Sequence, residues 1–294
     1  MLRFVLNEAG RLFLGLFGAA LMAAAVAALS VPHAADGLAY FLVAWGGRIN
    51  DLIHLRFGES VISGLPIIAE LAARLPLTLG LVIEGVIVAA LVGIPIGFLF
   101  GAGPARRAAA PLIQIVAAAP VFCAGLVLAY GAASLLHWPV PINGGVSIVL
   151  FPQNATQAQA MVLPALTVGL AGAAAVQLAL RRSAAEAGQQ SWRFYLRRMG
   201  LPSWDVERNY VMPQIFAGLL ASLGEVMLAL LSAAAVAEWV FSCRGAADLF
   251  VKSVALHDWS ATAAVLFVFA GLTLVAQFVG QCGARLLTSA GPAR

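Results

Sequence analysis

Six long apolar runs dominate the sequence and limit the folds that it can adopt. They cover residues 11–31, 77–101, 109–136, 161–180, 215–241 and 261–287. A helix needs about 20 mainly apolar residues to cross the hydrocarbon core of a bilayer, and each run reaches that length. Only 10% of the residues are charged, whereas soluble domains usually carry about 25%. The sequence therefore predicts an all-α polytopic membrane protein with six transmembrane helices.

The basic residues predict how these helices are oriented. Cytoplasmic loops of membrane proteins carry an excess of Lys and Arg. With both termini in the cytoplasm, only a minority of the 17 basic residues lie on the outer side, namely Arg48, Arg56, Arg74, Arg244 and Lys252. We therefore expect a multi-pass protein whose N- and C-termini are cytoplasmic. We also expect the first run to be retained rather than cleaved as a signal peptide, because it is long and five further spans follow it.

The spacing of the runs divides the chain into two parts. Residues 1–75 are predicted to form an N-terminal transmembrane helix and a long outer loop. Residues 76–294 are predicted to form a five-helix core with a cytoplasmic loop at about 183–212.

The longest polar interruption, residues 181–213, separates the fourth run from the fifth. It predicts two short amphipathic helices on the cytoplasmic side. In the first, residues 186–199, Glu186 suits the positive N-terminal end of the helix dipole. Four apolar residues recur there at i, i+3, i+4 and i+7, which places them on one helical face: Trp192, Tyr195, Leu196 and Met199.

The second short helix is predicted to begin after a break. Gly200, followed by Pro202, ends the first helix, and Ser203 would cap the second. Pro213 would mark the start of the fifth span. Two interpretations stay open for the pair: a surface that docks a soluble protein, or a helix lying on the inner leaflet, for which Arg and Trp are also suited.

The sequence contains no nucleotide-binding or catalytic motif. Lys252 is the only lysine and follows Val251, so the chain lacks the Gly-Lys-Ser/Thr ending of a phosphate-binding loop. The cysteines and histidines are scattered without the spacing of metal ligands. We therefore expect a protein that is not an enzyme, binds no metal or cofactor and has no nucleic-acid partner. Any ATP that drives it would be hydrolysed by another polypeptide.

The polar segment resembles the cytoplasmic signature of binding-protein-dependent ABC importer permeases (MetI-like type). That signature is EAA, three residues, Gly, nine residues and Ile-x-Leu-Pro. Gly200 takes the Gly position, and the residues at 210–213, YVMP, follow at the spacing of Ile-x-Leu-Pro. The EAA positions instead hold Phe194, Tyr195 and Leu196, a departure toward bulky side chains.

Five further stretches resemble the peptide/nickel subfamily of these permeases, the dipeptide/oligopeptide permease B-like group, in the same order. They are RFGES at 56–60, ELAARLPLTLGL at 70–81, GIPIG at 93–97, MVLPALTVGL at 161–170 and AEWVFSCRGAADLFVKSVALHDW at 237–259. Each match is weak alone, but the shared order and spacing are specific to the subfamily.

The resemblance implies a permease subunit in the inner membrane that imports peptides or a related small solute, such as a nickel chelate or a peptide-like compound. It implies a second, homologous permease, two ATPase subunits that bind ATP and Mg, and a periplasmic or lipid-anchored substrate-binding protein. The two cytoplasmic helices would then form a coupling pair that the ATPases move. The residues expected to couple are Glu186, Trp192, Tyr195, Leu196, Met199, Gly200 and Pro213.

Three polar residues inside the predicted spans are candidates for the translocation path. Glu84 and Glu225 lie midway along the second and fifth spans, and Gln177 lies in the fourth. Intramembrane carboxylates usually face the bundle interior or a wet cavity, so a cation-binding site and a protonated, hydrogen-bonded Glu are both open. Glu238, at the outer end of the fifth span, is expected to organise an outer gate.

Two other classes of function compete with the importer. The first is a secondary transporter in which Glu84 and Glu225 carry protons or cations. The second is a membrane scaffold that uses the cytoplasmic helices only to hold a soluble protein. Uptake driven by a proton gradient without ATP would support the former.

Overall fold

The computed structural model describes residues 2–29, 37–54, 56–99, 121–135 and 155–289, and these are helical apart from short connections. Within those ranges the only strand-like pairing is a single bridge between Glu59 and Pro66. Five described helices are long and apolar enough to cross a membrane: Arg3–Ala28, Ile67–Gly97, Met161–Gly188, Leu223–Val240 and Trp259–Thr288. The prediction of an all-α polytopic membrane protein is therefore confirmed. Of the third predicted span, residues 109–120 and 136 lie outside the described residues.

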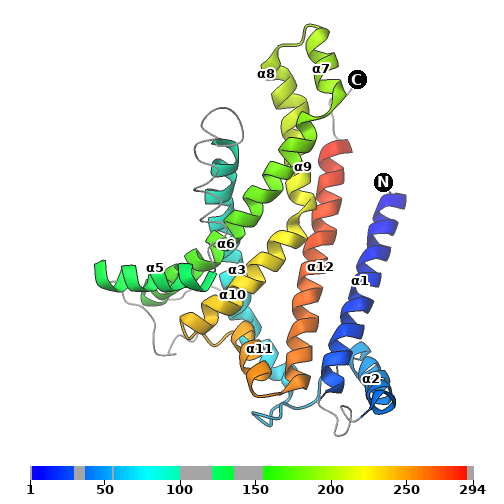
Figure 1. Ribbon diagram of the computed structural model, residues 1–294, viewed down its shortest axis with the longest axis vertical. Coiled ribbons are helices and arrows are strands. Elements are labelled where there is room, and N and C mark those ends of the chain that lie inside the picture. The colour runs from blue at the N-terminus through cyan, green and yellow to red at the C-terminus, as the bar shows by residue number, and fades with distance from the viewer. Residues whose placement is uncertain (1, 30–36, 55, 100–120, 136–154, 290–294) are drawn as a thin grey trace.

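The helices separate the molecule into two ends (Figure 1). The start of α1, the end of α12 and the short helices α7 and α8 lie at one end, which we call the inner end. Helices α2 and α11 lie at the opposite, outer end. The bounds are α1 (Leu2–Ala28), α2 (Leu38–Ile53), α3 (Ile67–Leu99), α5 (Val121–Leu135), α6 (Ala155–Gly188), α7 (Ser191–Arg198), α8 (Ser203–Val206), the π-helical turn η2 (Glu207–Val211), α9 (Met212–Ala221), α10 (Leu223–Val240), α11 (Ala246–Ala255) and α12 (Trp259–Ser289).

The core lies where α3, α6 and α10 cross, and small residues make these crossings close. Leu81, Val168 and Leu230 are fully buried there. A Cβ on Gly93 of α3 would lie 2.8 Å from the carbonyl oxygen of Ala173 in α6. Membrane helices associate through such small-residue contacts, because lipid tails offer no hydrophobic drive for helix packing.

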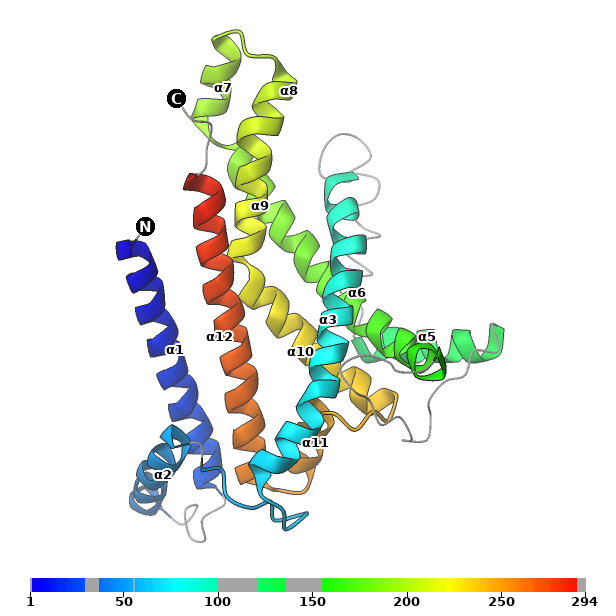
Figure 2. The same cartoon turned by 180° about the vertical axis from the view of Figure 1, so that it is seen from behind.

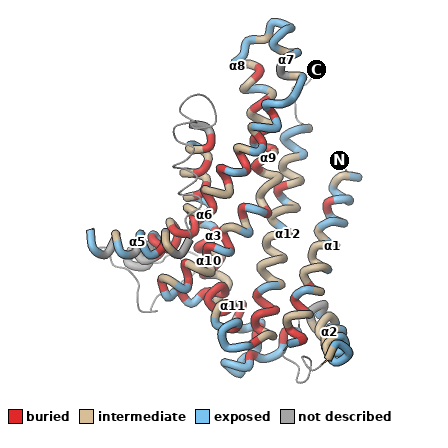
Figure 3. Tube along the Cα trace, viewed as in Figure 1, coloured by how far each residue is buried: buried red, intermediate tan, exposed pale blue. Residues whose placement is uncertain are grey.

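Helix α1 stands at the edge of this core. It packs along α12, where Gly15 faces the Leu274 side chain. Figure 3 shows its tube mostly exposed or intermediate, in contrast to the buried stretches of α6 and α10. Large apolar side chains such as Phe13, Leu14 and Met22 point away from the protein. This exposure is what a lipid-facing helix requires.

Two of the predicted spans differ in the structure. Helix α3 begins at Ile67 and continues through Pro76, so the predicted division between residues 75 and 76 falls inside a helix. The fifth run is interrupted at Ser222, between α9 and α10. The Ala221 carbonyl oxygen beside this break accepts hydrogen bonds from Gln277 Nε2 at 3.0 Å and Gln281 Nε2 at 3.4 Å. These amides on α12 satisfy a backbone group at the interruption.

Candidate functional sites

The two predicted short helices form the inner tip of the molecule, made of α7, α8 and the turn between them (Figure 2). The predicted start of the first helix is wrong. Helix α6 extends to Gly188, so exposed Glu186 lies in its last turn instead of starting a new helix. The break follows because Gly188 has low helix propensity and the backbone of Gln190 is extended. Helix α7 then begins at Ser191.

The predicted apolar stripe of α7 divides into an inward and an outward part. Trp192 and Leu196 are partly buried and pack against the core cluster. The Trp192 ring also lies 6.1 Å from the ring of Tyr210. Tyr195 and Met199 remain 64% and 62% exposed. The first two residues hold the tip in place, and the other two are available to a partner. Phe194 lies within α7, but its side chain is outside the described set.

The turn at Gly200 matches the prediction, whereas the helix that follows it does not. Gly200 has φ +90°, a left-handed conformation that glycine adopts without steric cost. Helix α8 is capped by Pro202 without a side-chain bond, so Ser203 is its first residue and not its cap. Pro213 lies in the first turn of α9, within a helix that is continuous from 203 to 221, not at the start of the span.

The continuous helix 203–221, which we call the rod, contains a wide turn just before its proline. In η2 the N–H of Met212 bonds to the Glu207 carbonyl, five residues back. Pro213 has no N–H to donate, and π-helical turns often absorb such an irregularity. An ion pair of 3.1 Å between Arg197 and Glu207 links the rod to α7. Trp204 of α8 is a further large apolar side chain exposed on the inner tip, at 70%.

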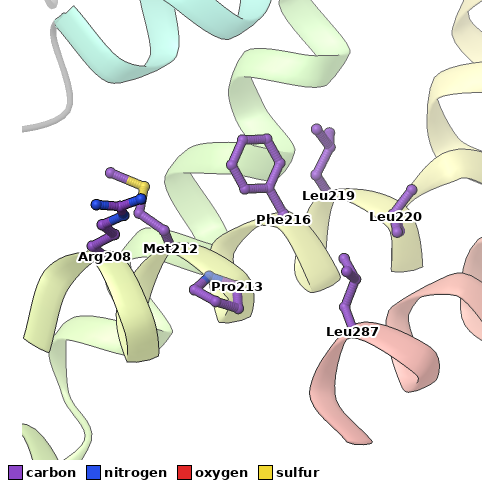
Figure 4. A pocket seen from close by; sticks show the side chains of 7 residues that line it. All are labelled: Arg208, Met212, Pro213, Phe216, Leu219, Leu220 and Leu287. Carbon is purple, nitrogen blue, oxygen red and sulfur yellow. The ribbon is translucent and has the colours of Figure 1, made fainter. Parts of the chain in front are cut away.

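An apolar groove of about 360 Å³ separates the rod from the end of α12 (Figure 4). It is lined by Arg208, Met212, Pro213, Phe216, Leu219, Leu220 and Leu287. Closer to the middle of the molecule the groove closes, because Gly280 of α12 lies directly against the Leu220 carbonyl. The inner part of the rod therefore stands partly apart from α12.

The structure does not bring the three predicted path residues together. Glu84 is half-buried on α3 and has no hydrogen bond or ion pair within the described part of the chain. Gln177 is buried on α6, and its Nε2 has no hydrogen-bond partner there. Glu225 is exposed and pairs with Arg182, with 2.8 Å between Oε2 and Nη1. Sequence reasoning missed this partner, because 43 residues separate the two positions.

Glu225 also lies in a different local setting from the one predicted. Because the fifth run breaks at Ser222, Glu225 occupies the first turn of α10 and not the middle of an unbroken helix. A carboxylate is stabilised there by the positive end of the helix dipole. The guanidinium of Arg182 adds a charge-assisted hydrogen bond.

At the outer end, Glu238 joins three segments through hydrogen bonds. Its carboxylate is fully buried. It accepts from Thr78 Oγ1 at 2.6 Å and from the Asp248 N–H at 2.7 Å. Thr78 Oγ1 in turn accepts from the Ala246 N–H at 2.8 Å, and the Glu238 carbonyl accepts from the Cys243 N–H at 2.8 Å. The segments 70–81 and 237–259, which carry the family resemblance, thus meet at one carboxylate.

The buried thiol of Cys243 lies beside this network. Burial, with added repulsion from the carboxylates of Glu238 and Asp248, raises the pKa of the Cys243 thiol to about 12. The thiol therefore stays protonated and unreactive at neutral pH. Among the residues that the structure describes, no group of three His, Cys, Asp or Glu side chains is placed to hold a metal ion.

A second buried carboxylate, Asp258, ties the first outer loop to α12 and was missed by the sequence analysis. It accepts hydrogen bonds from Ser60 Oγ at 2.6 Å, the Val61 N–H at 2.9 Å and the Ala261 N–H at 3.1 Å. An Asp just before an apolar helix is a recognised N-cap signal, and His257-Asp258-Trp259 fits it. The contact with Ser60 carries no such local signal.

Comparison with known proteins supports a transport assignment. Residues 89–288 match the family described as the binding-protein-dependent transport system inner membrane component. The peptide transport system permease protein SapB of Salmonella typhimurium is 26% identical over 274 residues, covering 85% of each chain. The putrescine export system permease protein SapB of Escherichia coli K12 is also 26% identical, over 275 residues and 85% of each chain. The probable D,D-dipeptide transport system permease protein DdpB of Escherichia coli K12 is 30% identical over 239 residues, 72% of this chain and 69% of that protein. The family match contains the inner tip and Glu238 with its partners in α11, whereas Thr78 precedes the matched residues.

Proposed function

Because this chain belongs to the family of binding-protein-dependent transport system inner membrane components, we propose that it is the permease subunit of an ATP-driven ABC importer. The observation that carries the proposal is the inner tip. It projects from the ends of two helices that continue into the membrane part, α6 and the rod, and exposes Tyr195, Met199 and Trp204. An apolar tip of this kind suits the cleft of a soluble ATPase. We place it, with both termini, in the cytoplasm.

Peptides are the substrate class that the relatives favour. Relatives of this chain are named for peptide and D,D-dipeptide transport, and one is named for putrescine export. A peptide or a peptide-like solute therefore fits the comparisons best, and a nickel chelate fits less well. Import, and not export, is the direction that the resemblance to importer permeases implies.

The proposed assembly contains four kinds of partner. A second, homologous permease would complete the path, two ATPase subunits would bind ATP and Mg, and a substrate-binding protein would deliver the solute from outside. The bilayer of the inner membrane would surround the apolar helices. Bulky, exposed Tyr195, where the family signature has a small residue, implies an ATPase cleft that is wide and apolar, whereas Leu196 packs against the core cluster of this chain.

A secondary transporter receives less support. Such a protein needs carboxylates that can gain and lose a cation during the cycle. Glu225 is already paired with Arg182, and no described contact links Glu225 to Glu84. The observations favour an energy source outside this chain.

The proposal is tested by substitution at the tip. Tyr195→Asp places a charge on the exposed docking surface, so we expect ATP-dependent uptake and co-purification of ATPase subunits to be lost, with normal membrane insertion. Tyr40→Asp is the matched control, because Tyr40 is 66% exposed on α2 at the opposite end. Full uptake by Tyr195→Asp, or a tagged chain that purifies from its native membrane without any ATPase, would overturn the proposal.

A further inference from the structure

The Arg182–Glu225 pair is an unusual charge arrangement for two membrane helices. Arg182 belongs to the candidate span Met161–Gly188 and Glu225 to the candidate span Leu223–Val240. Their charged atoms are 2.8 Å apart, yet the side chains remain 54% and 63% exposed. The pair is therefore not part of the buried core. It presents one cation and one anion side by side on the surface of α6 and α10.

This surface is unsuited to lipid. Charged side chains within spans nearly always face the bundle interior or water, and an ion pair still carries a large desolvation cost when it leaves water. On α10 the exposed positions after Glu225 are Leu228, Ser232 and Trp239. Leu228 and Trp239 are apolar, as are the exposed positions in the middle of α1, so the ion pair itself is what argues against lipid on this face. We therefore assign the lipid contact to α1 and water, or the second permease, to the α6–α10 face.

The chemistry of the pair fits a solute that carries both charges. Arg presents several N–H donors in a fork that matches a carboxylate, and the Glu225 carboxylate can accept from an ammonium group. Because the two charges neutralise each other, the pair does not attract or repel a solute by net charge. A zwitterion can meet both groups at once.

We propose that Arg182 and Glu225 form a two-charge site on the wall of the translocation path, where Arg182 meets a carboxylate and Glu225 meets an ammonium group of the passing solute. The proposal rests on the proposed function as a peptide permease and adds a determinant of charge selectivity. Removing one member leaves the other charge unpaired on the wall, so the path acquires a net charge that discriminates among solutes.

The experiment measures relative uptake from an equimolar mixture of Ala-Ala, Ala-Lys and Ala-Asp. The host lacks its own peptide uptake and expresses the complete transporter, and intracellular peptides are quantified by mass spectrometry. Glu225→Gln leaves the Arg182 cation unpaired, so we expect uptake of Ala-Lys to fall about fivefold relative to Ala-Asp. This is the effect expected from the interaction of two unit charges about 4 Å apart in water. Arg182→Gln should shift the same ratio in the opposite direction by a similar factor.

Two controls separate selectivity from structure. The exchange Arg182→Glu with Glu225→Arg keeps the pair, so the wild-type ratio should return. Arg11→Gln breaks the 2.7 Å pair of Arg11 with Glu8 on α1, away from the assigned path, and should leave the ratio unchanged. Because each ratio is taken within one culture, it does not depend on how much of the variant reaches the membrane.

The outcomes distinguish this inference from the function on which it rests. If the wild-type transporter accumulates the dipeptides and both single variants keep the wild-type ratio, the two-charge site is wrong while the permease assignment stands. The site is equally wrong if both variants shift the ratio in the same direction. If the wild-type complex accumulates none of the three, peptide import is wrong and this inference falls with it.

Discussion

At the outer end, two buried carboxylates bond separate segments together, whereas the ion pairs that join separate segments toward the inner end stay open to their surroundings. Glu238 and Asp258 are fully buried and bonded to neighbouring segments. The side chains of Arg182–Glu225, nearer the inner end on α6 and α10, are 54% and 63% exposed, and those of Arg197–Glu207 at the tip are 45% and 30% exposed. Losing one partner of a buried polar network is expensive, while an exposed ion pair contributes little. The difference indicates that the segments joined by Glu238 and Asp258, which we call the outer frame, are fixed in place. The inner end can rearrange at a low cost in free energy.

The largest effect on stability is expected when the Glu238 carboxylate is removed. Glu238→Ala leaves the Thr78 hydroxyl and the Asp248 N–H without their acceptor in a buried site. We expect the free energy of unfolding to fall by about 3–5 kcal/mol, because two buried donors lose their acceptor and the side chain leaves a cavity, measured as loss of folded protein in a denaturant titration in detergent micelles. Glu225→Ala is the inner-end control and should cost less than about 1 kcal/mol. Equal losses would remove the distinction between the two ends.

Gly245→Ala tests whether the outer frame is packed tightly around the same carboxylate. The backbone of Gly245 has φ −89° and ψ −175°, which any residue can adopt, so only the added methyl group matters. That Cβ would lie 2.3 Å from the Glu238 carboxylate, and the network would have to shift. Overpacking of this kind costs about 2 kcal/mol, read in the same titration. Gly46→Ala, where the added Cβ meets nothing within 4 Å, should show no loss.

Much of this architecture could be predicted from local sequence patterns. Run length and hydropathy predicted the five spans found among the described residues, and Gly200 predicted the turn at the inner tip. The placement of Glu238 at the end of its span predicted an organising role for the outer loop, and its hydrogen bonds fit that role. These features depend on residues that are neighbours in the sequence and on whether a segment is apolar or polar. Both can be read from the sequence alone.

The parts that could not be predicted depend on contacts between distant segments. The break at Ser222 has no proline beside it. The side-chain amides that bond the adjacent Ala221 carbonyl belong to Gln277 and Gln281 of another helix. Arg182 was placed in the polar cytoplasmic segment 181–213, because nothing local pairs it with Glu225. Glu186 was placed at a helix start, although α6 extends beyond the apolar run that defined its predicted end. The hydropathy of a sequence shows which residues can lie in the membrane, but it does not show where the helix that contains them ends.

Asp258→Asn is a milder test of the outer frame. The amide keeps one acceptor oxygen, but its NH₂ group replaces the oxygen that meets either the Ser60 hydroxyl and Val61 N–H or the Ala261 N–H. Loss of charge-assisted bonds should lower the free energy of unfolding by about 1.5 kcal/mol. Asp205→Asn, in the first turn of α8 at the inner tip, is the control for the change of residue type and should cost less than half as much.

The Cys243 thiol gives the outer end a dependence on alkaline pH. Its folded-state pKa of about 12 lies above the ordinary cysteine value of 9.0, so the folded state holds this proton more tightly. The stability it contributes is complete below pH 9 and is lost as the pH rises from there toward 12. Between pH 8 and pH 10 we expect a loss of about 1.4 kcal/mol that Cys243→Ala abolishes. Cys282→Ala, on α12 toward the inner end, should leave the pH dependence as in the wild type.

The smallest effect is expected at the inner tip itself. Arg197→Gln removes the 3.1 Å pair with Glu207, whose side chains are 45% and 30% exposed. An exposed pair of this kind is worth about 0.5 kcal/mol or less, so thermal unfolding should hardly change. The pair nevertheless joins α7 to the rod, and its loss lets the two helices of the tip move apart. We therefore expect ATP hydrolysis by the assembled complex to become less dependent on added substrate-binding protein and solute, at unchanged stability. A loss of stability as large as that of Glu238→Ala would contradict the view that the inner end is loosely held, because it would show that the Arg197–Glu207 pair fixes the position of α7 against the rod.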